Sequence, residues 1–244
     1  MISIAKQVKE VLKSFDINCL YPSSSKISNL ISEKIQSDKL VANRSDLVIA
    51  IGGDGTLLST ARNFGHFNVP VLGINLGNLG FLTDIPPADL TFSLRRILEG
   101  KYVEDKRIFL EAKIAGKKRK YKALNEIVLH SGSIAQLIEY DLFIESEFVY
   151  RQKADGIIIS TTTGSTAYSL SGNGPIISPE VDAITLLPMF PHSLNARPLV
   201  IDENKAIQIV VRDKSYLSLD SHNNLKLKPG DVINIKKSIS ELKL

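Results

Sequence analysis

Hydrophobic residues in the first hundred positions follow two patterns, helical spacing and short continuous apolar runs. The helical spacing predicts helices at residues 4–15, 25–35 (capped by Ser25), from 57 onward and 88–98. The apolar runs predict strands at residues 16–21, 47–51 and 69–74. Because helices and strands alternate, this part of the chain is expected to form a Rossmann-like parallel sheet covered by helices.

The pattern changes after Gly100, where short β-rich segments are mostly joined by tight polar turns. Strands are expected near residues 107–115, 119–130, 137–144, 147–152, 156–160, 183–187, 206–211, 216–220 and 231–236. Such a series is typical of an antiparallel, sandwich-like β domain. The predicted fold class is therefore an α/β domain over residues 1–100 followed by an all-β domain over residues 101–244.

Composition limits the classes of protein. With 43% hydrophobic and 23% charged residues, the chain is typical of an ordinary globular protein. No apolar run reaches the ~20 residues that span a membrane, and the charged helical pattern after Met1 predicts no signal peptide. We therefore expect a cytoplasmic protein. Its net charge of +4 suits an anionic ligand and is too small to indicate nucleic acid, and its only cysteine, Cys19, excludes an internal disulfide.

The first candidate for chemistry is the glycine-rich turn that follows the strand at 47–51 and precedes a helix. Its residues are Gly52, Gly53, Asp54, Gly55 and Thr56. Strand, glycine-rich turn and helix together favour a phosphate-binding loop, with a plain strand–helix turn as the alternative. The carboxylate of Asp54 would repel a phosphate unless a metal or the chemistry requires it, so a bland turn does not explain it.

Two polar segments of the β-rich part complete the candidate site. The segment from Asp155 to Ser169 is an apolar strand running into a cluster of hydroxyl residues around Gly164, which offers hydroxyls and amides to a polar ligand or simply caps a helix. The pair Asn125-Glu126 could read an adenine edge and ribose hydroxyls, although a polar strand edge alone would also account for it. If both side chains touch one ligand, the strand must be irregular there or begin just after Glu126.

The other charged or titratable features favour structural interpretations. The histidines, at positions 66, 130, 192 and 222, have no metal-ligand spacing. The basic run Gly116 to Lys120 is expected to be a solvated hairpin tip. Arg197, in the proline-rich segment 188–198, could pair with a carboxylate or a phosphate.

Four segments, taken in order, closely resemble the NAD kinases over roughly residues 46–235. They are GGDGT, NE, DGIIISTTTGSTAYSLSGNGP and PHSLNARPLV. These enzymes phosphorylate the adenosine ribose 2′-hydroxyl of NAD to make NADP. The resemblance implies the two-domain fold above, an active site between the domains, NAD and ATP or polyphosphate as substrates, a divalent metal such as Mg²⁺, and a homodimer or homotetramer. It also implies a further C-terminal segment, beyond Leu244, that folds back on the first domain.

The resemblance also implies roles for individual residues. Asp54 would accept the proton of the ribose hydroxyl or position the metal, with Gly55 in the same contact. The nucleotide-binding residues would be Asn125, Glu126, Lys153, Asp155, Thr166, Ala167, Tyr168, Ser169, Leu170, Ser171 and His222. Two other classes share some of these features: lipid kinases of the diacylglycerol or sphingosine type, which carry GGDGT, and non-catalytic NAD(P) sensors. The polar segment 155–171 argues against an acyl tunnel, and an intact Asp54 argues against a sensor.

Overall fold

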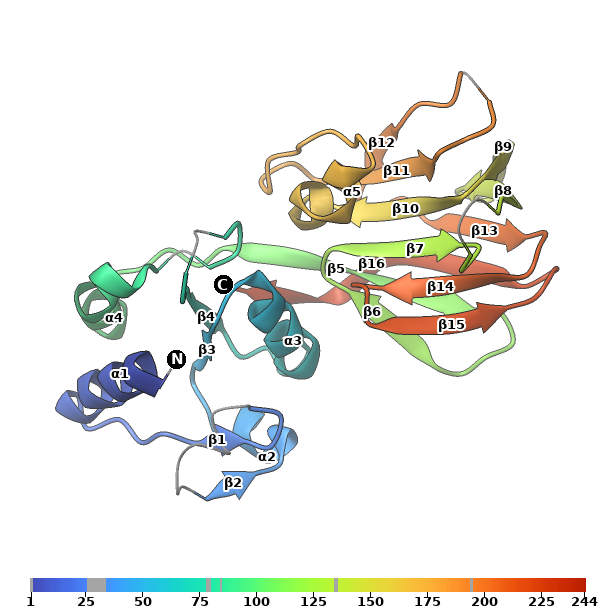
Figure 1. Ribbon diagram of the computed structural model, residues 1–244. Coiled ribbons are helices and arrows are strands. Elements are labelled where there is room, and N and C mark those ends of the chain that lie inside the picture. Colours follow the sequence, from blue (N-terminus) through green and yellow to red (C-terminus); the bar gives the residue numbers. More distant parts are fainter. Residues whose placement is uncertain (1, 26–33, 78–79, 84, 134–135, 194) are drawn as a thin grey trace. The chain divides into compact units, whose positions relative to one another are not determined.

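The computed structural model describes residues 2–25, 34–77, 80–83, 85–133, 136–193 and 195–244 of the chain. It divides into two compact units (Figure 1). Unit 1 comprises Met1–Lys106 and Ser240–Leu244, and unit 2 comprises Arg107–Ile239. Within unit 1 the last residue, Leu244, exchanges two backbone hydrogen bonds with Asp105, so the end of the chain returns to the first unit.

Unit 1 is the α/β part. Its α-helices are α1 (Ile2–Ser14), α2 (Asp38–Ala42), α3 (Asp54–Phe64) and α4 (Leu90–Leu98), with 3₁₀ turns η2 (Gly65–Phe67) and η3 (Pro87–Asp89). Its strands form two parallel pairs: β1 (Tyr21–Pro22) with β2 (Ile35–Gln36), and β3 (Val48–Ile51) with β4 (Val71–Ile74). The apolar faces of α1 and α4 share a core with the ends of β3 and β4, so the parallel strands are covered by helices as the hydrophobic pattern predicts.

Three details of unit 1 differ from the prediction. The strand expected at 16–21 is reduced to β1, because Asp16 takes a left-handed backbone conformation (φ 56°) and turns the chain after α1. Most of the helix expected at 25–35 lies outside the described residues, and its last residue, Ile35, belongs to β2. The short helix α2 was not predicted; Ser37 caps it by accepting a hydrogen bond from the Leu40 amide.

Unit 2 is a sandwich of two six-stranded sheets. The first sheet is, in order, β12 (Leu199–Asp202), β11 (Ala183–Met189), β10 (Gly156–Thr161), β7 (Glu126–His130), β14 (Ser215–Leu219) and β15 (Asn223–Leu227). The second is β6 (Lys120–Ala123), β5 (Lys106–Ile114), β16 (Val232–Lys243), β13 (Ile207–Val211), β8 (Ile138–Ile144) and β9 (Glu147–Ala154). Residues from both sheets form one apolar core, which confirms the predicted all-β class.

Side-chain alternation gives the first sheet two different faces. In β7, Ile127 and Leu129 point into the sandwich core, so Glu126 and Val128 lie on the opposite face. Glu126 pairs with Ser160 of β10, which pairs in turn with Thr185 of β11, so three polar side chains lie in a row on that outer face. A short connection, η4 (Thr163–Thr166) and α5 (Tyr168–Ser171), follows β10 near this row (Figure 1).

The region around residues 116–130 agrees with one prediction and differs from another. The basic run at residues 116–120 connects β5 to β6 and is exposed, as expected for a solvated hairpin tip, with Gly116 at φ 75°. The strand expected at 119–130 is instead two strands, β6 and β7, interrupted at Leu124-Asn125. No helix in the described part of the chain is long and apolar enough to cross a membrane.

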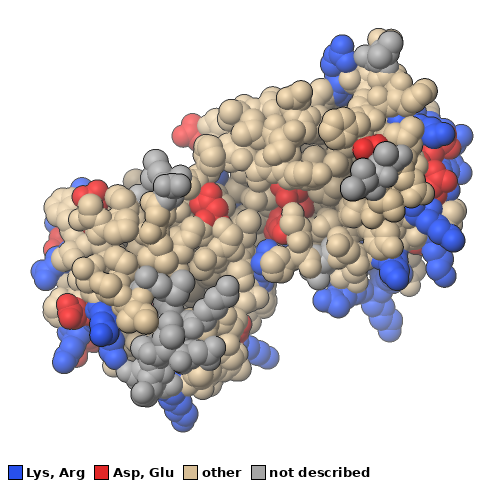
Figure 2. Space-filling view, viewed as in Figure 1, with Lys and Arg blue, Asp and Glu red and all other residues tan. Residues whose placement is uncertain are grey.

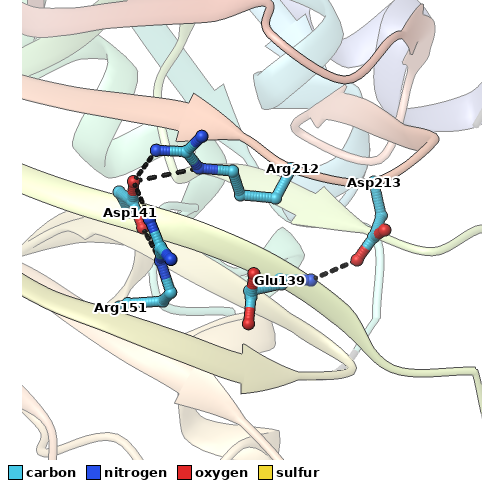
Figure 3. A network of polar contacts seen from close by, with 5 residues as sticks. All are labelled: Glu139, Asp141, Arg151, Arg212 and Asp213. Carbon is cyan, nitrogen blue, oxygen red and sulfur yellow. Dashed lines mark hydrogen bonds and ion pairs between the residues drawn. The ribbon is translucent and has the colours of Figure 1, made fainter.

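A buried carboxylate ties three strands of the second sheet together (Figure 3). Asp141 on β8 is paired with Arg151 on β9 through two hydrogen bonds, at 2.6 and 3.1 Å, and with Arg212, just after β13. The Asp141 side chain is only 3% exposed, whereas both arginines reach solvent. Hydrogen bonding to Arg151, followed by Arg212, lowers the pKa of Asp141 below its ordinary value.

We expect Asp141→Asn to destabilise the protein by roughly 1–3 kcal/mol, because charge-assisted hydrogen bonds are lost at a buried site. The contribution is present above the pKa of the unfolded aspartate and disappears as pH falls through the lower folded value. Urea unfolding at pH 7 measures it. Asp213→Asn is the control, since Asp213 accepts the Glu139 amide at 2.8 Å and no arginine among the residues drawn with it (Figure 3), and should matter less. Equal effects of the two substitutions would contradict the prediction.

Candidate active site

The glycine-rich loop of unit 1 joins β3 directly to α3. Gly53 is the N-cap residue and α3 begins at Asp54. A Cβ at Gly52 would overlap the side chain of Thr56, so the tight turn requires glycine there. Gly53 and Gly55 are exposed, and nothing lies within 4 Å of where their Cβ atoms would be. The loop therefore presents bare backbone at the N-terminus of an 11-residue helix, which favours an anion.

Asp54 also fixes a neighbouring turn of unit 1. Its Oδ2 accepts a hydrogen bond from the Phe81 amide at 2.9 Å, and its Oδ1 accepts from the Leu82 amide at 3.2 Å and the Thr83 hydroxyl at 3.3 Å. A Cβ at Gly80 would overlap this carboxylate, so the close approach requires glycine. Oδ2 receives one hydrogen bond from the described residues and keeps a lone pair for a further donor.

In unit 2, the break between β6 and β7 presents Asn125 and Glu126. The backbone carbonyls of this break accept hydrogen bonds from Thr161, the last residue of β10. The Thr161 hydroxyl donates to Leu124 O at 2.6 Å and the Thr161 amide donates to Asn125 O at 2.9 Å. The Gly164 amide donates in turn to the Thr161 hydroxyl at 3.1 Å. The hydroxyl-rich segment after β10 thus shapes the backbone that carries the Asn125-Glu126 pair.

We expect Gly164→Ala to destabilise unit 2 and weaken ligand binding. A Cβ there would overlap the carbonyl oxygen of Asn125, which is backbone and held by Thr161, so it cannot move aside. Overpacking of this kind costs about 1–3 kcal/mol. Urea unfolding measures the loss, and Gly55→Ala, whose Cβ would meet no atom within 4 Å, is the control. A Gly164→Ala protein as stable as the control would contradict the clash.

The side chains of this pair are buried without complete partners. Asn125 Oδ1 and Glu126 Oε2 have no hydrogen-bond partner among the described residues, although the two residues are only 6% and 3% exposed. Burial, followed by the nearby charge of Asp220, raises the pKa of Glu126 to about 7, and a hydrogen bond from the Tyr168 backbone opposes the shift. Unpaired buried polar atoms are rare in proteins and here indicate a place for a polar ligand.

A cavity of about 460 Å³ opens on the outer face of the first sheet. Its volume is in the range typical of small-molecule sites. The lining residues come from β7, β11, α5, the β14–β15 hairpin and the connections that follow β7 and precede β10: Val128, His130, Ser131, Gly132, Ser133, Asp155, Tyr168, Met189, Ser218, Ser221 and Asn224. The predicted residues Asp155 and Tyr168 are among them, so the structure brings these two together.

His130 is a cavity residue that sequence reasoning assigned to a structural role. It stacks on Tyr216 with ring centroids 5.9 Å apart, and its Nδ1 accepts the Gly132 amide at 3.1 Å. Burial lowers the pKa of His130, which favours the neutral ring, while a hydrogen bond with Asn224 opposes the shift. Its position at the end of an apolar run was the only signal in the sequence.

The surface around α5 carries little charge. The sequence from Gly156 to Pro179 contains no Asp, Glu, Lys or Arg. In Figure 2 this part of unit 2 is largely uncharged, whereas Lys and Arg side chains gather at the right-hand end of the unit. Apart from the cavity residue Asp155, the groups that would meet a ligand near α5 are amides, hydroxyls and the exposed side chains of Tyr168 and Leu170.

The remaining predicted residues fall into three groups. Ser169 is buried, with its hydroxyl unpaired among the described residues, while Thr166 and Ala167 are partly buried and Ser171 is exposed. His222 is exposed and lies next to the cavity residue Ser221. The side chain of Lys153 is exposed and does not line the cavity; its carbonyl accepts the His192 amide.

A metal site built from protein side chains alone is absent from the described part of the chain, where no three His, Cys, Asp or Glu side chains gather closely enough to hold a metal ion. Mg²⁺ is usually bound through one or two carboxylates together with substrate phosphates. A single carboxylate beside a phosphate loop, as in Asp54, fits that mode.

Comparison with known proteins identifies the family. The ATP-NAD kinase N-terminal domain model matches residues 2–102, and the ATP-NAD kinase C-terminal domain model matches residues 124–244. The NAD kinase of Marinobacter nauticus is 45% identical over 218 residues, which cover 86% of this chain and 74% of that protein. That of Pseudoalteromonas translucida is 46% identical over 222 residues, covering 86% and 76%. The chain belongs to the NAD kinase family.

Solved structures of NAD kinases and related enzymes agree with this assignment. Yeast NADH kinase complexed with NADH superposes with a TM-score of 0.87 at 30% identity, covering 98% of this chain and 78% of that chain. An NAD kinase from Archaeoglobus fulgidus in complex with ATP gives 0.80 at 26% identity, covering 98% and 88%. The predicted family, the two-part fold class and the assignment as an NAD kinase, a phosphotransferase, are therefore confirmed.

Proposed function

We propose that this NAD kinase transfers a phosphoryl group from ATP, another nucleoside triphosphate or polyphosphate to the 2′-hydroxyl of the adenosine ribose of NAD. The observation that carries the assignment of residues is the pair of buried, unpaired acceptors, Asn125 Oδ1 and Glu126 Oε2. An adenine amino group and ribose hydroxyls are donors, so a bound nucleotide supplies what these oxygens lack. The cavity lined by Asp155 and Tyr168 receives other parts of the same dinucleotide.

The phosphate loop of unit 1 acts on the donor and on the reacting hydroxyl. The bare amides around Gly53 and Gly55 hold phosphates at the N-terminus of α3. Asp54, through the remaining lone pair of Oδ2, accepts the proton that the ribose hydroxyl loses as its oxygen bonds to phosphorus. The bond between that phosphorus and the rest of the donor breaks, and ADP, another nucleoside diphosphate or the shortened polyphosphate leaves. Two donors on Oδ1 and one on Oδ2 keep the carboxylate from rotating, so the proton acceptor is fixed in direction.

A divalent metal, most simply Mg²⁺, would arrive bound to the phosphates, and Asp54 is the carboxylate of the loop that would reach it. Its chemistry would be to neutralise charge on the transferring group. Asp54 would then position the metal, in addition to or instead of accepting the proton. We also propose a cytoplasmic homodimer or homotetramer that requires neither membrane nor nucleic acid.

The test is direct. The purified protein is incubated with NAD, Mg²⁺ and either ATP or polyphosphate, and NADP is detected with an NADP-dependent dehydrogenase. We expect NADP with at least one donor and none when Mg²⁺ is chelated. A parallel reaction with NADH reports the choice of acceptor. Absence of NADP with every donor would refute the proposed reaction for this chain.

A further inference from the structure

The turn between β14 and β15 holds the backbone that presents Asn125 and Glu126. Asp220 begins this turn and is only 6% exposed. Its carboxylate accepts hydrogen bonds from three successive backbone amides, those of Leu124 at 2.9 Å, Asn125 at 2.8 Å and Glu126 at 3.2 Å. The Asp220 amide also donates to Glu126 O at 3.1 Å. One aspartate therefore receives every amide of the break between β6 and β7.

Conformation and burial both indicate that this arrangement is specific. Asp220 and the following Ser221 have left-handed backbone conformations, with φ of 44° and 56°. Such conformations are uncommon outside glycine and mark positions that the surroundings determine. A buried carboxylate is stable when several amides donate to it, as here. With Thr161 holding the carbonyls and Asp220 holding the amides, both sides of the Leu124–Glu126 backbone are fixed.

We propose that Asp220 is a positioning residue for nucleotide binding: it aims the side chains of Asn125 and Glu126. This inference rests on the proposed role of the Asn125-Glu126 pair. Neither Asp220 nor Glu126 needs to touch the reacting phosphorus for the effect. Because two of the three amides belong to Asn125 and Glu126, which carry the unpaired acceptors, a shift of Asp220 moves both acceptors together.

The charged and titratable surroundings of Glu126 are simple. The turn contributes Asp220, and it also contains His222, which is exposed. On the sheet, the partners opposite Glu126 on β10 and next along on β11 are the hydroxyl residues Ser160 and Thr185. From α5 comes the Tyr168 backbone amide. Burial is the largest cause of the raised pKa of Glu126, and the charge of Asp220 adds to it.

Asp220→Asn tests the inference. Asparagine tolerates a left-handed backbone, and its carbonyl can still accept from the Asn125 and Glu126 amides, but it lacks the charge and turns a donor toward the Leu124 amide. We expect the KM for NAD to rise about tenfold to a hundredfold, as for loss of a charge-assisted hydrogen bond, with a smaller change in kcat. The pH at which Glu126 titrates, followed by carbon NMR of its carboxyl, should fall.

Controls separate positioning from general loss of structure. Asp231→Asn removes the same kind of turn contact, a carboxylate accepting the Lys228 amide at 2.9 Å, at another hairpin, and should leave KM and the Glu126 titration unchanged. If Asp220→Asn does not fold, Asp220→Gly keeps the left-handed turn and removes the carboxylate. In either variant, amide hydrogen exchange at Leu124–Glu126 should accelerate relative to the Asp231 control.

The outcomes are distinct from those that test the reaction itself. The NMR titration and the amide exchange need no turnover, so they judge the role of Asp220 even if the wild-type chain forms no NADP. A folded Asp220 variant with unchanged KM, unchanged exchange and an unchanged Glu126 titration would overturn the inference. Failure of both replacements to fold, with wild-type amides at 124–126 exchanging as fast as exposed loop amides, would overturn it as well.

Discussion

Asp54→Asn is expected to reduce turnover by about 10²- to 10⁴-fold while NAD still binds, because the amide cannot accept the proton of the ribose hydroxyl. Asparagine keeps Oδ1 as the acceptor for the Leu82 amide and the Thr83 hydroxyl. Its Nδ2 replaces Oδ2, the oxygen that carries the remaining lone pair and accepts the Phe81 amide, so that hydrogen bond is lost as well. Steady-state kinetics of NADP formation give kcat, and calorimetric titration with NAD gives binding.

A second variant separates chemistry from anchoring. Thr83→Val removes one hydrogen bond to Oδ1 and leaves the carboxylate in place, so it tests how much activity depends on holding the turn at residues 80–83. We expect less than a tenfold change in kcat for it. A near-wild-type rate for Asp54→Asn would exclude Asp54 as the base. Equal losses for the two variants would assign Asp54 an anchoring role.

Periodicity was sufficient for the fold class because each half of the chain has one dominant pattern. Continuous apolar runs gave β3 and β4, and alternating short segments gave most of the sandwich strands. Hydrophobic periodicity did not predict where a strand is interrupted by local hydrogen bonding. The break at Leu124-Asn125 interrupts the β-rich segment predicted at 119–130, where an irregularity was expected only if Asn125 and Glu126 met one ligand. It exists because Asp220 and Thr161, distant in sequence, take its backbone hydrogen bonds.

The candidate site was predictable where short motifs concentrate chemistry in consecutive residues. The loop at Gly52–Thr56 and the segment after β10 are of this kind. Asp220 and His130 were missed for the opposite reason: each acts through partners on other strands, and nothing adjacent in the sequence marks it. Pairing between β7, β10 and β14 creates those neighbours, and strand order cannot be read from hydrophobic alternation.

Glu126→Gln is expected to make the protein more stable at pH 8, by about 3 kcal/mol, and to have little effect near pH 4.5. In the folded protein burial and Asp220 raise the pKa of Glu126 to about 7, from 4.5. Below the lower value both states are protonated. As pH rises from there to above 7, the carboxyl ionises more readily in the unfolded chain than in the folded protein, so the free energy of unfolding falls. Each unit of difference between the two pKa values contributes about 1.4 kcal/mol to the total fall. Glutamine stays neutral and keeps an acceptor for the Tyr168 amide.

Urea unfolding of wild type and variant at several pH values between 4.5 and 8.5 measures the difference. The exposed Glu147→Gln on β9 is the matched control and should follow the wild type throughout. A difference between wild type and Glu126→Gln that does not grow with pH would contradict a raised pKa. The same variant should also weaken NAD binding, because it removes the carboxylate. Greater stability together with lower affinity for NAD would show that Glu126 serves ligand binding and destabilises the fold.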